Sequence, residues 1–203
     1  MKIAGNLTAA SWATRAAELR KSSTPELWRQ TIQQYLDGRL HPRYLQPIGE
    51  MEKLNKFQGE GFSVVTIQCA LIEFLAALRE GVKYKREKPD PNNHEYSGSK
   101  KLFVKFLGTV PPFSTSIGAE AEGFYDDVRC GLLHEGQTKN RWLIKKRDGK
   151  CPATVISAGP QKTLYWSALQ CEIMGYLSGY RIALENDAGL QAAFLRKYDH
   201  LAS

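Results

Sequence analysis

Apolar residues recur every three or four positions along most of the chain, and this spacing is typical of amphipathic helices. Residues 25–38 show it clearly, because Thr24 can cap a helix, Pro25 suits its first turn and Gly38 suits its end. The same spacing predicts further helices in residues 7–21, 48–57, 102–107, 117–134, 161–184 and 188–198. The sequence therefore predicts a mainly α protein, an antiparallel helical bundle joined by short connections.

The most apolar segment, residues 62–78, is apolar nearly all round, which favours a central helix of the bundle over a surface helix. No apolar run reaches the ~20 residues that cross a bilayer, so we expect no membrane span. His41, Pro42 and Pro47 are expected to interrupt the helices before this segment. Residues 80–101 are polar and contain prolines and asparagines, which predicts a loop.

The sequence pattern changes after residue 139, where two short β-prone runs flank Asp148-Gly149. This dipeptide is a strong turn signal, so we expect a β-hairpin inserted after the helix of residues 117–134. Basic residues together with an aromatic platform suit single-stranded RNA. The candidate RNA-binding residues of this hairpin are Trp142, Lys145, Lys146, Arg147 and Lys150. The alternative is a solvated edge, protected from aggregation by its lysines.

The chain has 203 residues, which fits a single domain over 1–203 with residues 1–57 as an N-terminal helical extension. A net charge of +7 favours polyanionic partners, nucleic acid first. The four cysteines form no CxxC pair and no cluster with zinc spacing, so we expect reduced thiols and no metal or other cofactor. With no signal peptide apparent, the protein is expected to be cytoplasmic.

The stretch "FYDDVRCGLLHEG" places Arg129 five positions before His134, at the end of an expected helix that stops at Gly136. At about 100° per residue the two side chains lie roughly 140° apart, so the zinc-binding HExxH arrangement is excluded. One interpretation is purely structural. Both cations favour a helix C-terminus, Asp126 can pair with Arg129, and His134 can cap the last carbonyls.

This stretch also resembles the signature of the HEPN superfamily, in which an Arg is followed after four to six residues by a His near the end of a helix. The resemblance covers residues 124–138 and implies a four- or five-helix bundle over the whole chain. It implies a metal-independent endoribonuclease that forms a homodimer, with Arg129 and His134 as the catalytic pair. A toxin or defence role, with an antitoxin protein as a further partner, is also implied.

The chemistry of the two residues is coherent with cleavage of RNA. The 2′-hydroxyl of RNA is its own nucleophile, so neither a metal nor an activated serine is required. An imidazole transfers protons near neutral pH, and a guanidinium stabilises the charge that collects on the phosphate. The expected products are a 2′,3′-cyclic phosphate and a 5′-hydroxyl.

Two alternatives remain open. In many active members of the superfamily the residue after the Arg is Asn, Asp or His, whereas this chain has Cys130. That difference favours a non-catalytic HEPN-like module that binds RNA, a nucleotide or a protein. The other alternative is a helical interaction protein in which Arg129 and His134 only cap a helix.

Overall fold

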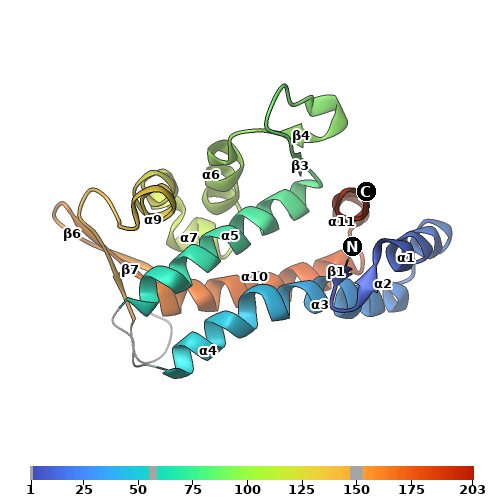
Figure 1. The fold of residues 1–203 in the computed structure, drawn as a ribbon, viewed down its shortest axis with the longest axis horizontal. Coiled ribbons are helices and arrows are strands. Elements are labelled where there is room, and N and C mark those ends of the chain that lie inside the picture. The colour runs from blue at the N-terminus through green and yellow to red at the C-terminus, as the bar shows by residue number, and fades with distance from the viewer. Residues whose placement is uncertain (1, 55–58, 147–152) are drawn as a thin grey trace. The chain divides into compact units, whose positions relative to one another are not determined.

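The computed structural model describes residues 2–54, 59–146 and 153–203 (Figure 1). Helices make up 70% of it, so the prediction of a mainly α protein is confirmed. The chain folds into two compact units. The terminal unit consists of Met1–Pro47, Ala77–Gly98 and Ser178–Ser203, and the central unit consists of Ile48–Ala76 and Ser99–Leu177. The N-terminal segment thus shares one unit with the C-terminal segment.

The terminal unit is built around a cluster of buried aromatic rings. Phe194 and Tyr198 stack with their ring centroids 4.3 Å apart, and Trp12 packs edge-on against Tyr35 at 5.0 Å. The hydroxyl of Tyr198 donates to the carbonyl of Tyr35 at 2.9 Å. The rings of this cluster come from both ends of the chain, from α1 (Ala9–Lys21), α2 (Pro25–Thr31), the π-helix η1 (Ile32–Asp37) and α11 (Ala188–Ala202). The same unit contains the short strands β1 (Lys2–Ala4), β2 (Leu7–Thr8), β3 (Lys83–Tyr84) and β4 (Glu95–Tyr96).

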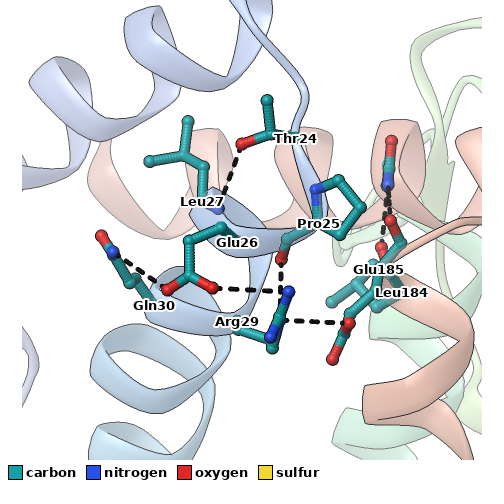
Figure 2. Close-up of polar contacts among 9 residues, drawn as sticks. Thr24, Pro25, Glu26, Leu27, Arg29, Gln30, Leu184 and Glu185 are labelled. Atoms are coloured by element: carbon teal, nitrogen blue, oxygen red, sulfur yellow. Dashed lines mark hydrogen bonds and ion pairs between the residues drawn. The ribbon is translucent and has the colours of Figure 1, made fainter.

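Helix α2 begins where the sequence predicts (Figure 2). The Thr24 hydroxyl accepts the amide of Leu27 at 3.3 Å, with Pro25 in the first turn. Arg29 lies between two carboxylates, 3.4 Å from Glu26 and 3.3 Å from Glu185. The cap satisfies one of the free amides of the first turn, and this fixes the start of the helix.

The expected breaks after this helix are wrong. Residues 25–54 form a continuous series of helical turns: α2, the π-helix η1 (Ile32–Asp37), α3 (Gly38–Leu40), the π-helix η2 (His41–Leu45) and α4 (Gln46–Leu54). Pro42 lies in the first turn of η2, and Pro47 is the second residue of α4. In an α-helix the proline ring clashes with the carbonyl four residues earlier. The wider π turn changes the position of that carbonyl, so the chain can stay helical around a proline.

Helix α5 (Glu60–Glu80) is the apolar helix that the sequence predicts, although it is longer than expected. Among the described residues it meets the length and composition criteria for a membrane span, with a mean hydropathy of 1.9 over 18 residues. The expectation that no apolar run is long enough is therefore wrong for α5. Because 56% of that window is buried, the helix fits the core of a folded protein.

The central unit has an aromatic core of its own. Phe103 stacks on Phe124 at 5.9 Å, and Phe106 meets Tyr176 edge-on at 5.0 Å. The helices that carry this core, besides parts of α4 and α5, are α6 (Ser99–Thr109), α7 (Phe113–Ser116), α8 (Ala121–Gly123), the π-helix η5 (Phe124–Arg129), α9 (Cys130–Glu135) and part of α10 (Trp166–Leu184). The buried side chain of Gln68 donates to the carbonyl of Trp166 at 2.9 Å and so ties α5 to α10.

The β structure differs from the expected hairpin. The sheet has the order β5-β7-β6, with β5 (Trp142–Lys145) parallel to β7 (Gln161–Tyr165) and β6 (Val155–Ala158) antiparallel to it. Residues 161–165 were expected to be helical, but they form the central strand, which runs directly into α10 (Figure 1). The hairpin joins β6 to β7 through Gly159, whose φ of +59° suits a tight turn. The predicted turn at Asp148-Gly149 lies outside the described residues.

The three cysteines within the described residues differ in their redox state. Cys69 and Cys130 are free thiols, and burial raises the pKa of Cys69, so this thiol stays protonated. Cys171 is disulfide-bonded. The expectation of reduced cysteines is thus wrong for Cys171, which spacing alone could not reveal because disulfide pairing depends on tertiary proximity.

Candidate active site

Arg129 lies where the helix changes its winding. It is the last residue of the π-helix η5, and α9 begins at Cys130. Short π-helical segments within α-helices occur frequently at functional sites. The buried face of η5 carries Phe124, Tyr125 and Val128, which anchor the turn in the core of the central unit. The backbone of Arg129 is therefore fixed by its neighbours.

The guanidinium of Arg129 contacts two other elements of the central unit and a ring of its own π-helix. Its Nη2 lies 2.9 Å from a carboxylate oxygen of Glu73 in α5 and 3.3 Å from the hydroxyl of Ser99 in α6. Its charged centre lies 5.1 Å from the centre of the Tyr125 ring. The Tyr125 hydroxyl in turn lies 2.9 Å from the Ser99 hydroxyl. The resulting cluster, Glu73–Ser99–Tyr125–Arg129, is held by direct hydrogen bonds.

This cluster keeps the guanidinium charged although it is largely enclosed. Only 17% of the Arg129 side chain and 22% of the Glu73 side chain are exposed. Burial lowers the pKa of Arg129, but the hydrogen bond and negative charge of Glu73 more than offset this, so the pKa is raised overall. The expected partner Asp126 instead binds Lys100, at 2.7 Å.

Cys130 contributes little to this cluster. Its sulfur lies 4.0 Å from Nη1 of Arg129, and sulfur is a weak acceptor. The polar contacts of the Arg129 guanidinium come instead from Glu73 and Ser99. These two residues could not be found from the sequence pattern, because they lie 56 and 30 positions from Arg129.

The end of α9 is shaped by two glycines. Gly136 adopts the left-handed conformation with φ of +66°, and its amide bonds to the carbonyl of Gly131. A Cβ at Gly131 would lie 2.4 Å from the carbonyl oxygen of Gln137. The chain that follows α9 therefore occupies the space beside Gly131, where it turns sharply away from the helix.

His134 lies in the last turn of α9 with its side chain exposed. Within the described part of the chain, no group hydrogen bonds to its imidazole. The neighbouring Leu133 is also unusually open for an apolar residue, at 49% exposure. His134 therefore presents an accessible proton donor or acceptor about one and a half helical turns from Arg129.

The residues predicted to bind RNA are in several environments. Trp142 is 2% exposed, and its ring packs against Phe124 with Lys162 above it at 5.5 Å. In this arrangement the ring belongs to the core and presents no face to a base. Lys145 is exposed, whereas Lys146 lies 3.8 Å from Glu52 and covers the ring of Trp166. Arg147 and Lys150 lie outside the described residues.

The segment between α9 and β5 is tied back to the helix. Asp127 accepts the side-chain amide of Asn140 at 2.8 Å, and its carbonyl accepts the amide of Lys139. Lys139 pairs with Glu135 at 2.6 Å, which lowers the pKa of that carboxyl. Across the residues that the structure describes, no group of three or more His, Cys, Asp or Glu side chains has the geometry of a metal site.

Comparison with family models, curated proteins and solved structures gives no match to this chain. The resemblance to HEPN proteins therefore rests on the sequence of residues 124–138 alone.

Proposed function

We propose that this protein is a metal-independent endoribonuclease of the HEPN type, with Arg129 and His134 as its catalytic pair. The observation that carries the proposal is the contrast between the two side chains at one helix end. The guanidinium of Arg129 is fixed by three neighbours, while the imidazole of His134 is exposed. A fixed cation and an accessible acid–base group on consecutive turns of one helix suit phosphodiester cleavage.

In this mechanism His134 takes the proton from the 2′-hydroxyl of RNA or delivers one to the leaving 5′-oxygen. The 2′-oxygen forms a bond to phosphorus, and the bond from phosphorus to the 5′-oxygen breaks. Arg129 stabilises the additional negative charge on the phosphate through guanidinium N–H groups that Glu73 and Ser99 do not occupy.

The proposal includes a homodimer. A single Arg129–His134 pair supplies one imidazole, whereas cleavage requires both a base and an acid. A two-fold axis near the end of α9 brings together two such pairs, since a symmetric dimer uses the same surface on both subunits. The exposed Leu133 provides apolar surface beside His134 for this contact. The antitoxin partner and the cytoplasmic location belong to the same proposal.

The product ends test the proposed chemistry. The full chain is incubated with mixed cellular RNA in the presence of EDTA, and the new ends are mapped. We expect 2′,3′-cyclic phosphates and 5′-hydroxyls, with no loss of cleavage in EDTA. Cleavage that stops in EDTA, or that leaves 5′-phosphates, contradicts the mechanism.

A second candidate is a non-catalytic module of the same type that binds RNA, a nucleotide or a protein. The ion pair between Arg129 and Glu73 favours it, because a guanidinium that already pairs with a carboxylate binds a phosphate less strongly. RNA binding without cleavage by the intact protein distinguishes this candidate from the ribonuclease.

A further inference from the structure

The terminal unit contains a pocket that is separate from the Arg129–His134 site. Its volume is about 370 Å³, which falls within the range of about 300–1,000 Å³ of small-molecule sites. The pocket lies where the end of α11 meets the segment that follows α5. The residues that give it chemical character are Lys83, Asn93, His94, Arg196, Asp199 and His200.

The one acidic side chain in this pocket is already satisfied. Asp199 accepts the indole N–H of Trp12 at 2.8 Å through one oxygen and pairs with Arg20 through the other. Its negative charge is therefore balanced by Arg20, and its two oxygens are engaged with α1. It contributes little attraction for a cation in the pocket.

The basic side chains are less fully balanced. Lys83 lies 3.2 Å from Glu95, but the same carboxylate also binds Lys85 at 2.8 Å, so two ammonium groups share one negative charge. Arg196 donates to the carbonyl of Glu80 at 3.3 Å, and the described residues place no carboxylate within ion-pair distance of it. Among the side chains that line the pocket, positive charge therefore exceeds negative charge.

The local backbone supports this arrangement. A Cβ at Gly81 would lie 2.8 Å from Nη2 of Arg196 and 2.6 Å from the backbone of Ala193, so only glycine lets the guanidinium approach. His94 adopts the left-handed conformation with φ of +54°, and its carbonyl accepts the amide of Lys83 at 2.9 Å. These contacts fix the positions of Arg196 and His94 at the pocket.

The pKa of His200 reflects the charges around the pocket. Burial lowers its pKa, and the positive charges of Lys197 and Lys83 lower it further, with Glu95 acting in the opposite direction. Its imidazole is thus surrounded by more positive than negative charge. Neutral imidazoles and the amide of Asn93 can still donate hydrogen bonds to an anion.

We propose that this pocket binds a small phosphate monoester of about mononucleotide size. Arg196 and Lys83 supply the charge that pairs with the phosphate, while His94, His200 and Asn93 donate hydrogen bonds. The remaining volume accommodates an organic group attached to the phosphate. The inference does not depend on ribonuclease activity, because every residue that lines this pocket belongs to the terminal unit.

The test uses the full chain and follows the ring resonances of His94 and His200 by NMR. The probes are adenosine 5′-monophosphate, inorganic phosphate and adenosine. We expect saturable shifts with the monophosphate at millimolar concentration or below, weaker binding of phosphate and no shift with adenosine. Equal shifts with adenosine, or none with the monophosphate, overturn the proposal. Shifts caused by single-stranded RNA but not by the monophosphate overturn it in favour of an RNA surface.

Two substitutions complete the experiment. Arg196→Gln removes the unbalanced charge and should weaken the binding of adenosine 5′-monophosphate at least about tenfold. Arg86→Gln, an exposed change in the preceding loop, should leave the affinity unchanged. Because Arg196→Gln can disturb the contact with Gly81, His200→Gln provides a second variant at an exposed position, which should also weaken binding. Unchanged affinity in both pocket variants contradicts the proposal.

Discussion

The contact between Arg129 and Glu73 decides how Arg129 can be tested. From sequence, Arg129 stands at a helix end, where substitution is expected to leave the fold intact. In the structure its guanidinium joins α5, α6 and η5, so removal leaves Glu73 without its cation and costs stability. Lost activity in Arg129→Ala would therefore not separate catalysis from folding, whereas the exposed His134 does not have this problem.

We predict that Glu73→Gln lowers the free energy of unfolding by about 1–3 kcal/mol, because hydrogen bonds to charged groups are worth that much when partly buried. The matched control is Asp126→Asn, which disrupts the exposed pair with Lys100 and should cost less than about 1 kcal/mol. Denaturant titration of both variants measures the difference. If Glu73→Gln costs no more than the control, the guanidinium is not anchored as described.

At Gly131 the close approach of the chain should outweigh helix propensity. Alanine normally gains about 1 kcal/mol over glycine inside a helix. Here its Cβ would meet the carbonyl of Gln137 at 2.4 Å, and overpacking of this kind costs about 1–3 kcal/mol. Gly131→Ala should therefore be destabilising by thermal unfolding, whereas Gly108→Ala, which has open space at its Cβ, should be neutral or stabilising. A stabilised Gly131→Ala would show that the turn at Gly136 shifts at little cost to make room for the added methyl group.

At the scale of elements, periodicity predicts the long helices well and fails where local signals compete. Helices α1, α5, α10 and α11 follow their apolar spacing closely. Pro42 and Pro47 misled the prediction because each lies in the first turn of a short helical segment, Pro42 in η2 and Pro47 in α4, which no periodicity reveals. Residues 161–165 were joined to α10 because a short β-prone run beside a helix carries no clear boundary. The turn signal at Gly159-Pro160 could have separated them.

The same limit applies to the candidate site. The spacing of Arg129, His134 and Gly136 identified the helix end correctly, because those features are local in sequence. Glu73, Ser99 and the burial of Trp142 depend on which distant elements pack together, and local patterns do not carry that information.

The segment from β3 to β4 should respond to acid. Hydrogen bonds from Lys85 and the amide of Asp90 lower the pKa of Glu95 to about 2. A lowered pKa stabilises the folded segment above the unfolded value of about 4.3, and this contribution is lost as pH falls towards 2. Hydrogen exchange at the Lys85 amide, which bonds to Tyr96, should lose protection over that range.

In Glu95→Gln that protection should already be reduced at neutral pH, whereas Glu87→Gln, an exposed change in the same loop, should behave as the wild type. Protection that is independent of pH in the wild type would show that the carboxylate of Glu95 does not hold the segment.

At the scale of the whole molecule, the net charge of +7 suggests salt-sensitive RNA binding. Lys145→Gln should reduce the dependence of log affinity on log salt by about 0.7, the value for one phosphate contact with a single strand. Lys146→Gln should have a smaller effect, since Glu52 and Trp166 already engage that side chain. Lys101→Gln serves as the control for loss of charge alone. An equal dependence of affinity on salt in all three variants would show that β5 does not contact RNA.

The proposed function depends on the imidazole of His134, so the rate of RNA cleavage under single-turnover conditions tests it most directly. The comparison is between the wild type, His134→Ala and His41→Ala, the last being an exposed histidine of the terminal unit. We predict that His134→Ala cleaves about 10²–10⁴-fold more slowly with an unchanged unfolding temperature, and that His41→Ala matches the wild type. Cleavage by His134→Ala at the wild-type rate would contradict the account.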